Sequence, residues 1–292
     1  MSAKNDSGKQ YHRESTGLAL DTVKRHGAEE DITLFGSCFC PFVQRVWVAF
    51  EYLGIPYKYY EVDPYAKPKE LLEFSPKGLV PGLKLHRFDP PRALNESTVI
   101  MEYLEDLAAG LGPRTLLPPL KYPYARALVR LQADHVNRAV VPAFYRYLQA
   151  QDVDAQIAGG KEFHASLEQL AALFERAERE LVTESETALG AGLWKEGGEI
   201  NWADIMVGPC KPPYPPLRDA HRAYNGSLGV FRATNVLKHY RGFEVPSGPK
   251  FDAWLKRLLE HPAFRSTCST EQLCLDSCER YGGAIRLQSA QY

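Results

Sequence analysis

The sequence has little of what marks several protein classes. Six cysteines in 292 residues are too few for a disulfide scaffold, so we expect reduced thiols. No apolar run approaches the roughly 18 to 20 residues of a membrane span, which excludes an integral membrane protein. The 35 basic and 36 acidic residues nearly cancel and give a formal net charge of -1. This balance disfavours a nucleic-acid binder that depends on a large basic surface.

Signals for metal and phosphate chemistry are also missing. The eight histidines form no His-Glu-x-x-His pattern, and no Gly-x-Gly-x-x-Gly or phosphate loop occurs. Cys274 and Cys278 share one face of an expected helix, which alone is a weak metal signal, and we expect no metal. Residues 1–17 lack the apolar core of a secretory signal and carry Asp6 and Glu14, which transit peptides avoid. A cytoplasmic location is therefore expected.

Regions of different pattern follow one another along the chain. Residues 1–30 are polar and are expected to form an unpacked extension. Residues 31–108 alternate β-rich runs with helical periodicity, residues 109–121 read as a linker, and residues 122–292 show helical stripes. The predicted fold class is thus a small α/β domain followed by an all-helical domain. In the first domain we expect helices at 40–53, 68–74 and 98–107 and strands at 31–37, 57–62, 83–88 and 92–95.

The order of these elements predicts how the strands pair. The two strands joined through the helix at 40–53 should be parallel, because a helix-length crossover permits that pairing. The strands on either side of Asp89-Pro90-Pro91 should form an antiparallel hairpin at the sheet edge. Later in the chain, Asn201 and Asp204 have the spacing of a capping box at a helix start. A proline-rich stretch at 211–216 interrupts the helical pattern.

Cys40 lies where a strand gives way to a helix whose first residue is Pro41. Its sulfur is expected to lie over the unpaired amides and the positive end of the helix dipole. Such a position lowers the pKa of a thiol from about 8.5 into a range of roughly 3.5 to 7.5. A thiolate of this kind is a good leaving group from a mixed disulfide, so the position favours thiol–disulfide exchange. The alternative is a structural cysteine that caps the helix.

The surroundings of Cys40 predict an external thiol as its partner. A dithiol redox helix would carry Cys-x-x-Cys, but position 43 is Val43. Cys38 could form only a short, strained bridge to Cys40 and is otherwise a small core residue. A single attacking cysteine needs a second thiol to release it, and glutathione is the natural candidate.

Several segments occur in order and at compatible spacing, namely Phe39-Cys40-Pro41-Phe42 with Arg45, Lys67-Pro68, Gly78-Leu79-Val80-Pro81, Asn95-Glu96-Ser97-Thr98 and Ile100-Met101-Glu102-Tyr103-Leu104. Together they closely resemble the omega-class glutathione transferases. The resemblance runs continuously from about Asp31 to Asp106 and resumes more weakly through the helical half. It implies a thioredoxin-like N-terminal domain, an all-helical substrate-binding domain, glutathione as co-substrate and a homodimer.

The same resemblance implies which residues form the site. Cys40 would be catalytic, and a cis bond between Val80 and Pro81 would leave the backbone of Val80 free to pair with the cysteinyl part of glutathione. Gly82 departs from the family's usual apolar residue after this proline. The residues implied to bind glutathione are Phe42, Lys67, Val80, Pro81, Glu96 and Ser97.

The ends of the tripeptide would be held by charged and polar groups. Ser97 and nearby amides at a helix start would bind the γ-glutamyl carboxylate, and Glu96 would bind its ammonium group. Lys67 would meet the glycyl carboxylate. The alternatives are that Glu96 and Ser97 only cap the helix and that Lys67 is a solvated charge.

Aromatic residues of the helical half could line an apolar substrate pocket between the domains. Tyr124, Tyr145 and Trp254 are the candidates, and each is otherwise a core or interface residue. The leading hypothesis is a glutathione-dependent thioltransferase that acts on a small apolar or glutathionylated substrate through a Cys40–glutathione disulfide. The alternatives are a conventional conjugating transferase, with Ser37 as the nearby hydroxyl, and a non-enzymatic carrier of hydrophobic ligands.

Overall fold

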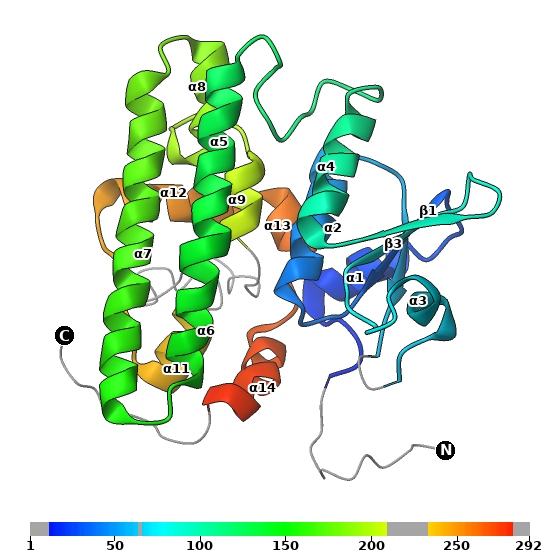
Figure 1. Cartoon of the computed structure of the whole chain (residues 1–292), viewed down its shortest axis with the longest axis horizontal. Coiled ribbons are helices and arrows are strands. Elements are labelled where there is room, and N and C mark those ends of the chain that lie inside the picture. The colour runs from blue at the N-terminus through cyan, green and yellow to red at the C-terminus, as the bar shows by residue number, and fades with distance from the viewer. Residues whose placement is uncertain (1–11, 64–65, 209–232, 283–292) are drawn as a thin grey trace, which may run out of the picture.

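The computed structural model describes residues 12–63, 66–208 and 233–282. A sheet part and a helical part lie side by side (Figure 1). The proline-rich stretch at 211–216 lies outside the described residues. Within the described part, no helix is both long and apolar enough to cross a membrane.

The sheet part is built on strands β1 (Ile32–Gly36), β2 (Lys58–Glu61), β3 (Gly82–Leu85) and β4 (Arg92–Asn95). Their order in the sheet is β2-β1-β3-β4. β1 and β2 are parallel, whereas β3 is antiparallel to both β1 and β4. The predicted parallel pair and edge hairpin are therefore confirmed. A helical crossover connects β1 to β2 and permits parallel pairing, whereas a short turn connects β3 to β4 and makes them antiparallel.

Helices cover both faces of this sheet. Helices α2 (Pro41–Leu53) and α4 (Ser97–Ala108) pack on the face that carries Leu34. Helix α3 (Lys69–Phe74) packs on the opposite face, where Leu71 meets Phe35. Leu34 and Phe35 are neighbours in β1 and point to opposite sides, as the alternation of a strand requires. The thioredoxin-like arrangement expected from the sequence is confirmed.

Helix α2 begins and ends where its sequence predicts. Pro41 is its first residue, a position where the missing N–H group costs no helical hydrogen bond. Gly54 ends the helix with a φ of 71°, a left-handed conformation that glycine adopts without steric cost. This placement puts Cys40 at the N-cap of the helix.

The helical part contains two long helical segments that lie side by side (Figure 1). Helix α5 continues through a π-helical turn into α6, and α7 runs alongside both. The elements are α5 (Pro123–His135), η1 (Val136–Val140), α6 (Val141–Gln149), α7 (Val153–Glu180), α8 (Glu184–Gly190), η2 (Gly192–Trp194), α9 (Trp202–Val207), η4 (Ala233–Leu237), α11 (Lys238–Arg241), α12 (Pro249–Glu260), α13 (Pro262–Ser266) and α14 (Glu271–Gly282).

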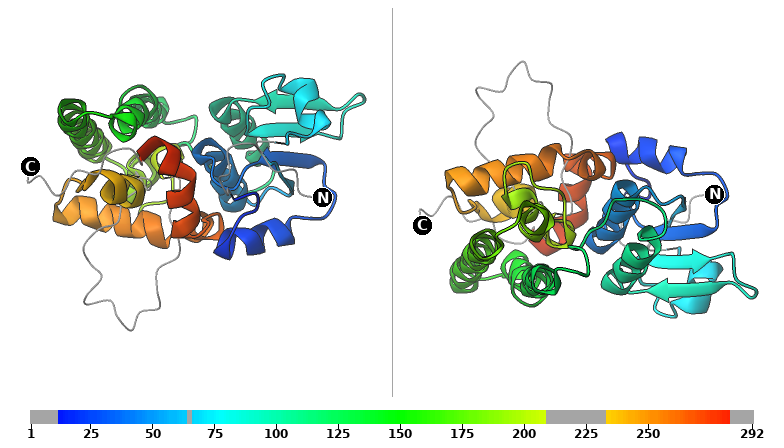
Figure 2. Two further views of the ribbon diagram at one scale, coloured as in Figure 1. Left: turned by 90° about the horizontal axis from the view of Figure 1, so that it is seen from below. Right: turned by 90° about the horizontal axis from the view of Figure 1, so that it is seen from above.

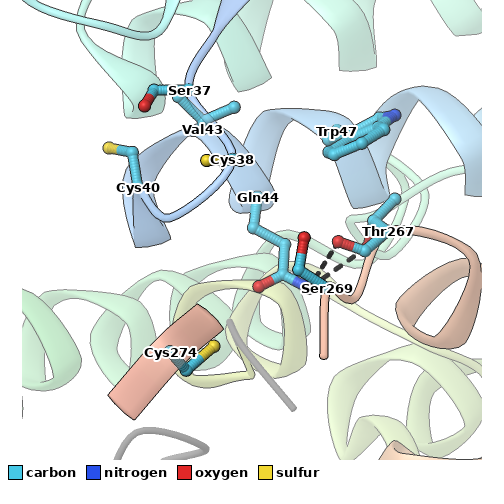
Figure 3. Close-up of a pocket in the computed structure, with 9 residues that line it drawn as sticks. All are labelled: Ser37, Cys38, Cys40, Val43, Gln44, Trp47, Thr267, Ser269 and Cys274. Atoms are coloured by element: carbon cyan, nitrogen blue, oxygen red, sulfur yellow. Dashed lines mark hydrogen bonds between the residues drawn. The ribbon is translucent and has the colours of Figure 1, made fainter. Parts of the chain in front are cut away.

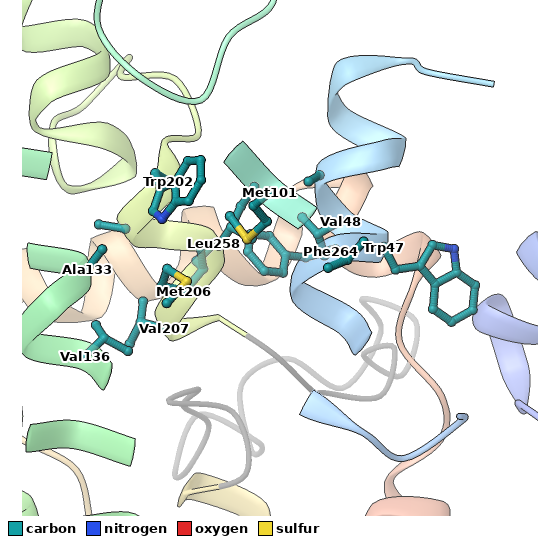
Figure 4. Close-up of a cluster of buried hydrophobic side chains, with 14 of the residues drawn as sticks. Trp47, Val48, Met101, Ala133, Val136, Trp202, Met206, Val207, Leu258 and Phe264 are labelled. Carbon is teal, nitrogen blue, oxygen red and sulfur yellow. The ribbon is translucent and has the colours of Figure 1, made fainter. Parts of the chain in front are cut away.

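One hydrophobic core runs through both parts. Val48 of α2 and Met101 of α4 belong to the same cluster as Trp202, Leu258 and Phe264 of the helical part (Figure 4). Because apolar side chains from both parts share this cluster, their relative position is held by burial of apolar surface.

The predicted capping box is present at the start of α9. The Asn201 side chain accepts from the amide of Asp204 at 3.0 Å, and the Asp204 carboxylate accepts from the amide of Asn201 at 3.0 Å. It also accepts from the amide of Leu193 and the indole of Trp254, each at 2.9 Å. Asp204 is fully buried, so the box is part of the core.

The prediction that residues 1–30 form an unpacked extension is wrong for helix α1 (Gly17–Arg25). Ala19 and Thr22 are buried, and the Thr22 hydroxyl donates to the carbonyl of Ser266 at 2.7 Å. In Figure 2, α1 lies next to α13. The local pattern could not reveal this packing, because the buried side chains are small and their partners lie near the other end of the chain.

Candidate active site

Cys40 lies at the half-buried start of α2. Its backbone is extended, with φ −82° and ψ 118°, and its side chain forms no capping hydrogen bond with the helix. The amide of Cys40 donates to the carbonyl of Ser37 at 3.0 Å, which closes the turn after β1. By position, the amides of Phe42 and Val43 are the first in α2 without a carbonyl one turn earlier. The sulfur therefore lies at the positive end of the helix dipole, as predicted.

The loop before β3 brings Val80 to Cys40. The Val80–Pro81 bond is cis, as predicted, and the Cys40 thiol donates to the carbonyl of Val80 at 3.7 Å. Gly82, the departure noted in the sequence, has a packing reason. A Cβ atom there would lie 2.8 Å from the ring of Phe74, so the α3 side occupies the space that a side chain would need.

Glu96 and Ser97 lie beside this loop. Gly82 pairs with Asn95 in the sheet, which makes Pro81 and Glu96 neighbours at the same strand ends. Glu96 has a φ of 70°, the one positive value among the described residues other than glycine. Such a conformation persists only where the surroundings impose it, and it is frequent at binding sites. Ser97 is the first residue of α4 and is 8% exposed.

Lys67 reaches the same loop from the other side. Its ammonium group donates to the carbonyl of Lys77 at 2.8 Å. Its side chain covers Gly78, where φ is 60°. This left-handed conformation is the reason for glycine at the turn, since the flexible lysine could move aside for a side chain. Lys67, Val80, Pro81, Glu96 and Ser97 thus lie around the loop before β3, whose Val80 carbonyl accepts from the Cys40 thiol.

Phe42 and Arg45 follow Cys40 on the first turns of α2. The guanidinium group of Arg45 lies over the ring of Phe42, 5.1 Å from its centre. Arg45 is 3% exposed and donates to the carbonyl of Met206 at 3.0 Å and to the side-chain oxygen of Asn137 at 3.1 Å. Burial lowers the pKa of Arg45 to about 10, and the charges of Cys40 and Tyr145 act in the opposite direction.

A small pocket behind Cys40 separates α2 from the C-terminal helices (Figure 3). The amide nitrogen of Gln44 donates across it to the hydroxyl and the carbonyl oxygen of Thr267, each at 3.3 Å. Ser37 is 3% exposed, and its hydroxyl has no hydrogen-bond partner among the described residues. The pocket is lined by Ser37, Cys38, Cys40, Val43, Gln44, Trp47, Thr267, Ser269 and Cys274.

Of the three aromatic residues predicted to line a substrate pocket, Tyr145 interacts with Arg45 of the site. It is half-buried on α6. The prediction is wrong for Trp254, which is completely buried and donates its indole N–H to Asp204. Tyr124 is exposed, and its hydroxyl donates to Glu180 on α7, so its role in a pocket stays a prediction. Tyr124 is on the first turn of α5, at the far end of that helix from η1, whose Asn137 meets Arg45.

The sequence reasoning missed Asn137 and Met206 as neighbours of the site. Asn137 belongs to the π-helical turn η1, and Met206 to the end of α9. No local signal marks either residue, because both act only through their contact with Arg45, which is distant in the chain. A π-helical turn is itself a frequent feature of functional sites.

Comparison with known proteins decides the family. Residues 34–113 match the model of the glutathione S-transferase N-terminal domain. Glutathione S-transferase U17 of Arabidopsis thaliana is 30% identical over 238 residues, which are 82% of this chain and 90% of that relative. The chain belongs to the glutathione S-transferase family. Membership supports glutathione as a ligand of the transferase.

Two further similarities concern particular members. Pyrimidodiazepine synthase of Drosophila melanogaster is 34% identical to the transferase over 123 residues, 42% of this chain and about half (48%) of that relative. The crystal structure of glutathione transferase Omega 3C from Trametes versicolor matches it with a TM-score of 0.69 and 30% identity, over 92% of this chain and 97% of the other. The whole-length match includes the helical part, where the sequence resemblance was weak.

Proposed function

We propose that this protein is a glutathione-dependent thioltransferase of the omega type, with Cys40 as the catalytic residue. The observation that carries the proposal is the thiol of Cys40 at the uncapped start of α2, within reach of the Val80 carbonyl beside the cis proline. A sulfur in such a position is favoured as a thiolate. The similarity to a transferase named as omega supports the same reading.

The reaction would proceed through one mixed disulfide. The Cys40 thiolate attacks the glutathionyl sulfur of a substrate R–S–SG, so that the bond to R–S breaks and R–S⁻ leaves to take up a proton. The thiolate of a second glutathione then attacks the glutathionyl sulfur on Cys40. Oxidised glutathione forms, and the Cys40 thiolate returns as the leaving group. Overall, R–S–SG and one free glutathione give R–SH and oxidised glutathione, so the free glutathione is the reductant and the other glutathionyl group comes from the substrate.

The residues around the loop before β3 would hold the tripeptide. The backbone of Val80 would pair with the cysteinyl residue as an added strand does. Ser97 and the first amides of α4 would bind the γ-glutamyl carboxylate, and Glu96 its ammonium group. Lys67 would exchange its contact with the Lys77 carbonyl for the glycyl carboxylate. Phe42, on the first turn of α2, would pack against the bound peptide.

The second candidate is a conjugating transferase, in which the thiolate of glutathione itself attacks an electrophile. This chemistry needs a hydroxyl that donates to the glutathione sulfur. Ser37 lines the same pocket as Cys40 and its hydroxyl is unpaired among the described groups. Its side chain is nevertheless 3% exposed, so it does not face an open groove. A carrier of hydrophobic ligands without turnover is the third candidate.

A paired assay on the parent, Cys40→Ser and Cys38→Ser separates these candidates. Thiol transfer from a glutathionylated peptide and conjugation of an aryl chloride are measured on each protein. We expect Cys40→Ser to lower transfer by roughly 100-fold or more, and Cys38→Ser to leave it near the parent rate. Incubation with oxidised glutathione should add one glutathione mass to the parent and to Cys38→Ser, but not to Cys40→Ser.

The other outcomes each contradict the proposal in a distinct way. Conjugation that survives in Cys40→Ser, with no transfer by the parent, would establish the conjugating transferase. Tight binding of an apolar dye with turnover in neither assay would establish the carrier. A glutathione adduct kept by Cys40→Ser and lost by Cys38→Ser would move the catalytic role to Cys38.

We also propose that the protein is a cytoplasmic homodimer, with a glutathione-binding domain at 31–108 and a substrate-binding domain at 122–292. The homodimer is inferred from the resemblance to the family. Sedimentation of the purified protein at twice the 32.9 kDa mass of the chain would support it, and a monomer mass would refute it.

A further inference from the structure

Arg45 is a buried cation without a carboxylate partner in the described part of the chain. It is 3% exposed. Its hydrogen bonds go to two neutral groups, the Met206 carbonyl at 3.0 Å and the Asn137 side chain at 3.1 Å, and its third neighbour is the Phe42 ring. Among the ion pairs of the described residues, none includes Arg45. Two neutral oxygens and a ring orient the guanidinium but do not neutralise it.

Such a charge is costly unless an anion compensates it. Taking an ion out of water costs several kcal/mol even after the protein relaxes. Burial lowers the pKa of Arg45 to about 10, while Cys40 and Tyr145, when ionised, favour its charged form. Coulomb attraction is mutual, so the charged Arg45 favours the ionised form of Cys40 to the same extent.

The direction of the side chain fits this coupling. Long side chains on a helix point back toward its N-terminus, and in α2 the N-terminus is the end that carries Cys40. Its two hydrogen-bond partners belong to η1 and to the end of α9. The guanidinium is thus fixed by the helical part although it belongs to a helix of the sheet part.

We propose that Arg45 is a positioning residue for the thiol site. Held by Asn137 and the Met206 carbonyl, its charge is the counter-charge of the Cys40 thiolate, so the helical part sets the reactivity of a cysteine in the sheet part. This inference rests on the proposed role of Cys40. It adds a second source of thiolate stabilisation to the amides of α2.

The other titratable groups around Cys40 in the described part of the chain include one further cation, Lys67, whose ammonium group donates to the Lys77 carbonyl. Tyr59 of β2 interacts with Cys40, and burial raises the pKa of Tyr59 well above its ordinary value. Tyr145 of α6 interacts with Arg45. Cys38 and Cys274, the latter on α14, line the same pocket as Cys40. Of the two cations, Arg45 is the buried one.

The pH dependence of alkylation at position 40 tests the inference without a transfer assay. Iodoacetamide is added from pH 4 to pH 10 in a Cys38→Ser background, and the peptide that carries position 40 is quantified by mass spectrometry. The expected midpoint for the parent lies below the ordinary thiol value of about 8.5. In Arg45→Met we expect it to rise by about 1 to 2 pH units, the effect of losing one nearby opposite charge.

Two further variants separate charge from packing. Arg45→Lys keeps the charge and should restore at least half of the shift. Asn137→Asp keeps Arg45 but gives it a carboxylate partner, so the midpoint should rise by about 1 unit or less. Asn137→Asp also covers the case in which Arg45→Met fails to fold.

Arg241→Met is the matched control. Arg241 is also a buried arginine held by carbonyls, those of Tyr147, Leu148 and Ala150, but it lies on α11. Its loss should destabilise the fold and leave the midpoint unchanged.

The outcomes distinguish the inference from the proposed function. A midpoint that stays at the parent value in Arg45→Met and Asn137→Asp would overturn the role of Arg45 and leave that of Cys40 intact. An equal shift of the midpoint in Arg241→Met would also overturn the role of Arg45, because general destabilisation of the fold would then explain the shift. A parent midpoint near 8.5 would contradict the proposed function itself.

Discussion

Two helix starts in this protein treat their unpaired amides in opposite ways. At α9 the side chains of Asn201 and Asp204 bond each other's amides, and Trp254 and Leu193 complete the box. At α2 the N-cap is Cys40, whose side chain bonds no amide of its own helix. The first start is sealed in the core, whereas the second faces the boundary between the parts.

The difference shows what each start contributes. A filled capping box satisfies the backbone and stabilises the fold. A helix start without a side-chain cap keeps its partial positive charge, which can stabilise an anion that binds or reacts there. On this view α9 contributes stability and α2 contributes chemistry, and the predictions below test that division.

The largest expected effect is on Asp204. Replacing it with alanine leaves the indole of Trp254 and the amides of Leu193 and Asn201 without an acceptor in the core. We expect the free energy of unfolding to fall by about 3 to 5 kcal/mol, measured by urea denaturation followed by circular dichroism. Asp134→Ala, which removes an exposed partner of Arg138, should cost less than about 1 kcal/mol. Equal costs for the two variants would contradict the comparison.

A smaller effect follows from the titration of Asp204. Burial raises its pKa to about 6, against about 4 in an unfolded chain. Since the folded state binds the proton more tightly, this group stabilises the fold below pH 4 and loses that contribution as the pH rises to 6. With 1.36 kcal/mol per pKa unit, the change is on the order of 3 kcal/mol.

The measurement compares the parent with Asp204→Asn, because other groups titrate in the same range. Burial also raises the pKa of Glu61 and Glu105, whereas burial lowers that of His261 to about 4, which acts in the opposite direction. The difference in unfolding free energy between the two proteins should therefore change between pH 4 and pH 6. A constant difference would show that Asp204 does not titrate there.

The smallest effect is at the other helix start. Cysteine is a poor N-cap and aspartate a good one, so Cys40→Asp should raise the free energy of unfolding by about 0.5 to 1 kcal/mol. The same variant should lose thiol transfer completely. Thermal unfolding and the transfer assay test the two halves of this prediction. A destabilised Cys40→Asp would indicate that the start of α2 already has all the partners it needs.

Local features of the sequence were predictable because their physics is local. Pro41 and Gly54 bound α2, and Asn201 and Asp204 form the capping box, each within a few residues. The cis bond before Pro81 was instead implied by the resemblance to the family. The pairing of the strands was predictable as well, because it depends on the length of the connections between them.

Contacts between distant segments were not predictable in this way. Trp254 has the spacing of a helical stripe, but periodicity cannot distinguish a core position from the wall of a pocket. Its acceptor, Asp204, lies 50 residues earlier. The partners of Arg45 lie 92 and 161 residues away. No pattern in a single sequence identifies such long-range pairs. These pairs nevertheless determine which aromatic residues lie near the site.

The residues just before α1 contact both the sheet part and the helical part of the molecule. Ser15 donates to Glu61 at the end of β2, and Thr16 pairs with Thr270 just before α14. Proteolysis between Ser15 and Arg25 would therefore remove contacts with both parts of the molecule. The presence of this segment is consequently a criterion of sample quality, to be checked by mass before activities of different preparations are compared.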